Sequence, residues 1–115
     1  EVALAATGDT ESFGVGEWSS VFATATNPEA FDGETITLTG FVTPGADTFR
    51  LTRLVITHCV IDAQAASLPI AAAGAAPATG QWVTVTGTIR DVDGALRVEA
   101  SEVTAIDEPK DPYEY

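Results

Sequence analysis

The sequence predicts an all-β domain, an OB-like five-stranded barrel with a short N-terminal helix. Two segments share one pattern: Ile36–Gly40 and Val83–Gly87 each alternate an apolar residue with threonine and end in glycine. Alternation with a period of two is typical of a strand with one buried face. A glycine inside such a strand permits the sharp bend by which a small sheet closes into a barrel. Five predicted strands are fewer than the about seven that a sandwich needs, so the barrel is favoured.

One helix is predicted ahead of the strands. Trp18, Val21 and Phe22 recur at helical spacing, which indicates a helix with one apolar face. This helix is expected over Val15–Ala25, and Asn27–Pro28 ends it because the residue before a proline is pushed out of the helical region. We expect its aromatic residues to attach it over one end of the barrel.

Turn signals separate the five strands. Asp93–Gly94 is a strong hairpin signal, and the second strand is expected to leave on a bend through Asp62–Gln64. The strands are expected over Glu34–Thr43, Phe49–Ala63, Ser67–Ala72, Gln81–Asp91 and Ala95–Ala105.

A chain of 115 residues is expected to form one domain. Residues 1–14 carry little pattern and are expected to be a flexible arm, while residues 15–106 form the barrel with its helix. The tail, residues 107–115, is rich in proline, tyrosine and acidic residues, and we expect it to lack regular structure. From composition alone, the tail is exposed, lies across the barrel or engages a partner.

The charge excludes two classes of partner. The chain has 17 acidic and 5 basic residues, a formal net charge of −12. Affinity for nucleic acids and for anionic membranes comes largely from cationic side chains, so neither is an expected partner. No apolar run approaches the ~18 residues of a membrane helix, so membrane contact is expected only through a missing N-terminal segment or anchor. The single cysteine excludes an internal disulfide.

His58, Cys59 and Asp62 are the one cluster with metal-ligand chemistry in the sequence. Zinc is the ion that would suit them, although adjacent strand residues point to opposite faces and would share a metal only across a bend. The favoured interpretation is a buried structural cysteine, a hydrogen-bonded histidine and an aspartate that caps the turn, with metal binding as the alternative. A Cys59–His58 catalytic pair is opposed by the same strand geometry, and we expect no enzymatic activity.

Arg53 and Trp82 complete the candidate binding residues. Arg53 lies inside a predicted strand and needs an oxygen partner if buried. Asp62 is isolated in the sequence, so a structural Arg53–Asp62 pair is expected, with a ligand-anchoring Arg53 as the alternative. Trp82, Phe41 and Trp18 would suit a nucleic-acid stacking platform, but such platforms lie in basic grooves and this chain is acidic. Trp82 is instead expected to cover one face of the barrel.

Five motifs in one order resemble the C-terminal domain of the YcgQ-like permease subunits of bacteria. They are Gly40–Val42, Phe49–Arg53, Cys59–Ala63, Gln81–Gly87 and Glu108–Tyr113. The resemblance covers Trp18 to Tyr115 and implies an OB-like domain that follows a membrane-spanning part and works beside a partner permease. It also favours a docked tail. The family typically has two adjacent cysteines where this chain has His58–Cys59, which keeps a possible ligand pair but removes vicinal-thiol chemistry.

The resemblance implies a non-enzymatic accessory, or interaction, domain of a membrane permease system, associated with the cell membrane on its extracytoplasmic side. We expect such a domain to expose an apolar patch to its permease partner. The alternative is a metal- or small-ligand-binding domain that uses the His58/Cys59/Asp62 bend, with Arg53 and Trp82 converging on the same cavity. The absent membrane segment is expected to reflect an excised or processed chain.

Overall fold

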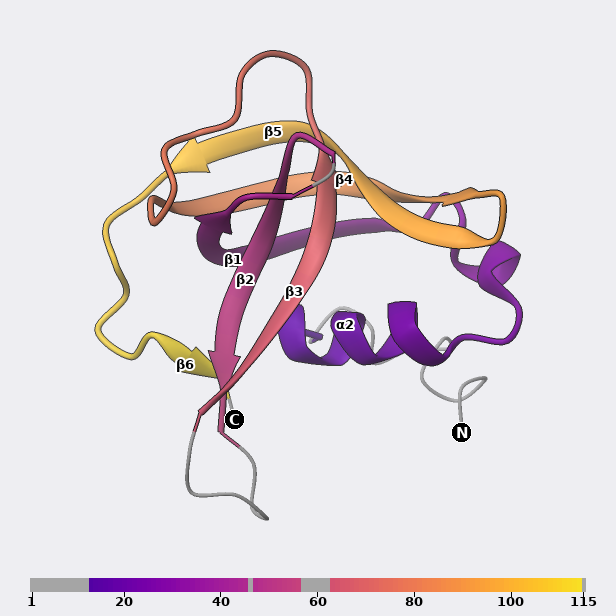
Figure 1. Ribbon diagram of the computed structural model, residues 1–115, viewed down its shortest axis with the longest axis horizontal. Helices are drawn as coiled ribbons and strands as arrows, with labels where there is room; N and C mark the ends of the chain where they lie inside the picture. Colours follow the sequence, from indigo (N-terminus) through magenta and orange to yellow (C-terminus); the bar gives the residue numbers. More distant parts are fainter. Residues whose placement is uncertain (1–12, 46, 57–62, 115) are drawn as a thin grey trace.

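The computed structural model describes residues 13–45, 47–56 and 63–114, and it is drawn in Figure 1. The described elements are one α-helix, one short 3₁₀ helix and six strands. In chain order they are α2 (Val15–Thr24), η2 (Pro28–Phe31), β1 (Thr35–Thr43), β2 (Phe49–Val55), β3 (Gln64–Ala71), β4 (Trp82–Val92), β5 (Ala95–Ala105) and β6 (Tyr113–Glu114).

Five strands close into a barrel, as the sequence predicts. They are ordered β1-β4-β5-β3-β2, and a further β1–β2 pairing completes the circle. The β3–β5 pairing is parallel and the other barrel pairings are antiparallel, which makes an OB-like barrel. Helix α2 packs against the barrel and lies alongside β3 in Figure 1.

Alternation along the strands builds the core. Ile36 and Leu38 of β1 face inward, as do Val83 and Val85 of β4. The threonines between them face outward, where Thr37 and Thr86 share a side-chain hydrogen bond of 3.2 Å. The fully buried residues also include Trp18 of α2, so the helix contributes its aromatic face to the same core, as expected.

The two interior glycines allow the close approach of neighbouring strands. A Cβ atom on Gly40 would lie 2.6 Å from the backbone oxygen of Thr52, and one on Gly87 would lie 2.5 Å from that of Glu99. The register of β4 and β5 also shifts at Gly87, where Ser101 is the extra residue of a β-bulge. The glycines are therefore required where the barrel coils most tightly.

Two predicted boundaries are wrong around the second strand. Strand β2 ends at Val55 rather than at Ala63, and β3 begins at Gln64 rather than at Ser67. The pairing of Val55 with Gln64 and of Leu54 with Ala65 recruits polar and alanine residues into β3. These residues have a low intrinsic propensity for strands, but pairing with β2 outweighs that propensity.

The tail is not irregular throughout, which corrects the prediction for residues 107–115. Tyr113 and Glu114 form β6, which pairs in parallel with Leu54 and Val55 of β2. In Figure 1 the tail crosses the left side of the barrel before it reaches the end of β2. Composition predicts the absence of intrinsic structure, but a free strand edge supplies backbone partners that composition does not reveal.

Candidate functional site: the tail-binding arginine

Arg53 projects from β2 into the gap between the barrel and the tail. Its side chain is only 14% exposed. Its Nε donates to the carbonyl oxygen of Pro112 at 3.0 Å and its Nη2 to that of Asp111 at 3.3 Å. Its Nη1 donates to the carbonyl oxygen of Thr39 at 3.2 Å. The guanidinium fork therefore ties the tail to strand β1 through backbone oxygens.

The ring of Trp82 lies against this guanidinium. The Arg53 carbon Cζ lies 5.5 Å from the centre of the Trp82 ring, within the range of a cation–π contact. Phe41, which faces Trp82 across the β1–β4 ladder, has its ring centre 5.4 Å away. The structure thus brings together Arg53 and Trp82, two of the predicted binding residues.

Glu114 anchors the end of the tail on helix α2. Its Oε2 accepts from the amide of Val15 and its Oε1 from the amide of Gly16, both at 2.8 Å. The first amides of a helix have no partner within the helix, and the positive end of the helix dipole favours a carboxylate there. The Arg53 Nη1 lies 3.9 Å from the Glu114 Oε2. A side chain at Gly14 would collide with this carboxylate, so the glycine leaves room for it.

A backbone hydrogen bond also holds the tail against β2. The amide of Ile56 donates to the carbonyl oxygen of Glu114 at 2.8 Å, directly after β2 ends. Sequence reasoning missed Glu114 as a partner of α2 and of Arg53. The glycines at the helix start, Gly14 and Gly16, are the one signal in the sequence for a carboxylate bound by the first helix amides. This signal is weak because it does not specify which acidic residue binds there.

The other predicted site residues, His58, Cys59 and Asp62, lie outside the described residues. The Arg53–Asp62 pair and the metal site therefore remain predictions. In the part of the chain that the structure describes, no group of three or more His, Cys, Asp or Glu side chains is placed to hold a metal.

The apolar patch expected on the surface remains a prediction, because the exposed large hydrophobic residues of the described surface are few. These residues are Val92, 40% exposed at the β4–β5 hairpin, and Tyr113, 36% exposed in β6. They lie on different elements, and single exposed residues of this kind are ordinary on soluble domains. Among the described helices, none is long and apolar enough to cross a membrane.

Together, the fold and this site define a class of protein: a small OB-like barrel domain that binds its own C-terminal tail by strand addition and an arginine fork. The chain belongs to the family described as the DUF1980 C-terminal domain, whose model matches residues 17–115. This membership agrees with the resemblance to the C-terminal domain of the YcgQ-like proteins. A search of curated proteins found no match.

Proposed function

We propose that this chain is a non-enzymatic accessory domain of a membrane permease system and that it docks on its permease partner on the extracytoplasmic side through an acidic surface. Membership in the DUF1980 C-terminal domain family supports the permease context, because the resemblance to the YcgQ-like permease subunits, with which this membership agrees, implies a domain that follows a membrane-spanning part. The mode of docking rests on charge rather than on an apolar patch.

The observation that best supports docking through an acidic surface is that the arginine side chains bind groups of the domain itself. Arg50 donates to the Ser67 hydroxyl at 2.9 Å, and Arg53 binds the tail. Arg90 and Arg97 both pair with Glu99, at 3.4 and 3.2 Å. Four of the five basic residues are thereby turned to internal contacts, while the acids outnumber the bases by 17 to 5.

Exposed acids remain over several elements, including Glu29 of η2, Glu102 of β5 and Glu108 of the tail. Such a surface attracts a partner that presents Lys and Arg side chains, and it raises the rate of encounter more than the final affinity. Association through it weakens as ionic strength rises. The partner that fits is therefore a permease with a basic extracytoplasmic face.

The test is chemical cross-linking in intact cells of the host, followed by purification of the tagged chain and identification of its neighbours by mass spectrometry. We expect a membrane permease to be captured, and less of it at high ionic strength. A variant with Glu29, Glu102 and Glu108 all changed to Gln should capture several-fold less. The matched control changes the same three residues to Asp and keeps the charge. Capture that is equal for both variants, or that contains no permease, contradicts the proposal.

Zinc binding at His58, Cys59 and Asp62 is a second candidate, favoured by the adjacency of the chain's one histidine and one cysteine. Native mass spectrometry with added zinc tests it. We expect one zinc ion per chain, lost in the His58→Ala, Cys59→Ser double variant and retained in a Thr57→Ala control. Absence of zinc from the folded wild type assigns Cys59 to a structural role.

A further inference from the structure

The C-terminal tail consists of a short attached segment at the end of an unattached connector. The chain is bonded to the barrel as far as Ile106, whose amide donates to the carbonyl oxygen of Trp82 at 2.9 Å. The next contacts come from residues 111–114, where β6 pairs with β2 and the Arg53 fork binds two carbonyl oxygens. The connector, residues 107–110, makes no hydrogen bond or ion pair with another residue that the structure describes. The end of the tail can therefore leave the barrel without disturbing the closed sheet.

The place that the tail occupies has a defined chemistry, and we call it the tail slot. It consists of the Arg53 guanidinium, the edge of β2 at Leu54 and Val55, and the first amides of α2 at Val15 and Gly16. These groups bind backbone carbonyl oxygens, the backbone of a strand and one carboxylate, that of Glu114. Strand addition gives affinity through main-chain hydrogen bonds, and a pocket for a particular side chain adds specificity. The tail slot therefore suits an extended peptide segment that carries an acidic residue at the position of Glu114.

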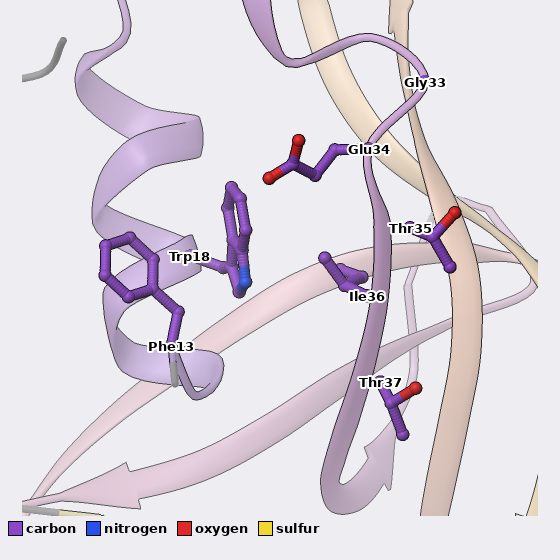
Figure 2. A pocket seen from close by; sticks show the side chains of 7 residues that line it. All are labelled: Phe13, Trp18, Gly33, Glu34, Thr35, Ile36 and Thr37. Atoms are coloured by element: carbon purple, nitrogen blue, oxygen red, sulfur yellow. The ribbon is translucent and has the colours of Figure 1, made fainter. Parts of the chain in front are cut away.

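The tail slot is built by the barrel and the helix and does not depend on the tail. The Arg53 Nη1 is held by the carbonyl oxygen of Thr39 at 3.2 Å. The start of α2 is fixed by the fully buried Val15 and Trp18, and the Phe13 ring meets that of Trp18 edge to face. Figure 2 shows these two rings next to each other beside the helix. A vacated slot keeps its shape but leaves a nearly buried guanidinium and two helix amides without their tail partners. Because this loss is costly, the slot favours a new occupant.

A second copy of the chain supplies that occupant with no change of sequence. Its Glu114 and its tail carbonyl oxygens would make the same contacts, since none of these contacts involves the connector. The seven residue steps from Ile106 to Tyr113 span up to about 23 Å when extended. Pro109 and Pro112 favour an extended conformation in the residues before them, which directs the tail away from its own domain when it is released. The Tyr113 ring is 36% exposed in the docked tail, so a second domain can cover it.

We propose that two copies of this chain exchange their C-terminal tails, each tail filling the tail slot of the other copy in a closed two-fold dimer. The exchange keeps every contact of the tail, so the monomer and the dimer differ in the conformation of the connector and in the cost of association. A short flexible connector gives the tail an effective concentration of about 1 mM at its own slot. The dimer should therefore become abundant near that protein concentration.

The charge of the chain adds a dependence on salt. Each copy carries a formal net charge of −12, and salt screens the repulsion between the two copies. Salt also weakens the contact of Glu114 with α2, but equally within one chain and between chains. The dimer should therefore increase with ionic strength. This inference does not rest on the proposed permease role.

Disulfide trapping between two full-length chains tests the exchange. Because β6 pairs Tyr113 with Leu54, one chain carries Leu54→Cys and the other Tyr113→Cys, both with Cys59→Ser so that each has a single thiol. Paired strand residues lie within the Cα separation of a disulfide, and here the bond can form only between chains. At about 1 mM we expect at least about tenfold more mixed disulfide than from a control in which Val92→Cys, at an exposed position of the β4–β5 hairpin, replaces Leu54→Cys. A yield equal to that of the control overturns the proposal.

The molar mass of the wild-type chain is an independent readout. Analytical ultracentrifugation from about 0.01 to about 2 mM should show a dimer fraction that rises with concentration and with added salt. Arg53→Ala should lower this fraction several-fold, because its tails stay undocked, and Lys110→Ala in the connector should leave it nearly unchanged. Hydrogen-exchange protection of the β4–β5 ladder verifies that the Arg53 variant is folded. A dimer that persists in Arg53→Ala, or a wild type that stays monomeric throughout, overturns the proposal.

A free peptide of residues 107–115 distinguishes a second copy from another protein as the occupant. In millimolar excess it should reduce the mixed disulfide between the Leu54→Cys and Tyr113→Cys chains, and the peptide with Glu114→Gln should compete less well. Its entry into the slot of the wild-type chain is followed by the NMR shift of the Ile56 amide, which bonds to β6. A peptide that enters the slot while no mixed disulfide forms assigns the slot to segments of other proteins and overturns the exchange of tails between copies.

Discussion

The barrel and the C-terminal tail are stabilised in opposite ways. The barrel closes around a continuous apolar core whose residues alternate regularly along β1 and β4. The tail contributes a two-residue strand, and its attachment depends on the Arg53 fork and the Glu114 carboxylate. The core is a cooperative structure, whereas the tail rests on a few polar contacts that can open locally. A change in the barrel should therefore lower global stability, while a change in the tail should release the tail and leave the barrel folded.

The largest expected effect is in the core. Leu51 of β2 is fully buried, so Leu51→Ala removes apolar burial and leaves a cavity. We expect a loss of about 2–5 kcal/mol in the free energy of unfolding, measured by denaturant titration. Val92→Ala, at an exposed position, is the control and should change stability by no more than about 0.5 kcal/mol. Comparable effects of the two variants would show that the core is not cooperative.

The next-largest loss of stability is expected at Gly40, where β1 lies close to β2. Gly40→Ala places a methyl group 2.6 Å from the Thr52 backbone oxygen, and this strand oxygen cannot move freely. We expect a loss of about 1–3 kcal/mol, seen as a lower midpoint of thermal unfolding. Thr37→Ala on the exposed face of the same strand is the comparison. If Gly40→Ala is as stable as wild type, the close strand approach is not required.

Arg53→Ala should release the tail rather than destabilise the barrel. It removes three hydrogen bonds from a charged donor to backbone oxygens, and we expect about 1.5–3 kcal/mol less stability for the docked tail. Hydrogen exchange should accelerate at Ile56, whose amide is bonded to β6, while the β4–β5 ladder stays protected.

Arg53→Lys should restore little of this docking, because an ammonium group lacks the planar fork. Lys110→Ala, an exposed cation of the tail, is the matched control. Loss of protection throughout the barrel in Arg53→Ala would mean that the tail belongs to the cooperative core.

The smallest effect is at the helix terminus. Glu114→Gln keeps the side-chain shape but removes the negative charge at the start of α2. We expect a loss of about 0.3–1 kcal/mol that shrinks as salt is added. Glu108→Gln, an exposed acid of the same tail, should show neither change. A salt-independent loss in Glu114→Gln would assign the contact to hydrogen bonding without the charge.

Sequence reasoning succeeded where local pattern carries the information. The alternation around Gly40 and Gly87 predicted both strands and their bends, and Asp93–Gly94 predicted the hairpin, where both residues adopt positive φ. It selected Arg53 and Trp82 as candidate ligand-binding residues, which remains a prediction, and it assigned neither to the tail. Docking of the tail, which the family resemblance favours, is confirmed, but the prediction that the tail lacks regular structure is wrong because β6 exists only through pairing with β2.

The sequence by itself determined the barrel, its helix and its acidic character, since period-two alternation, helical spacing and charge are properties of neighbouring residues. Tertiary structure alone decided what Arg53 and Glu114 bind. The partners of Arg53 are carbonyl oxygens, which every residue possesses, so no side-chain pattern identifies them. Glu114 likewise reaches the amides of Val15 and Gly16 only because the tail is folded back to the start of α2. A site of this kind arises from the juxtaposition of distant elements, which local periodicity does not encode.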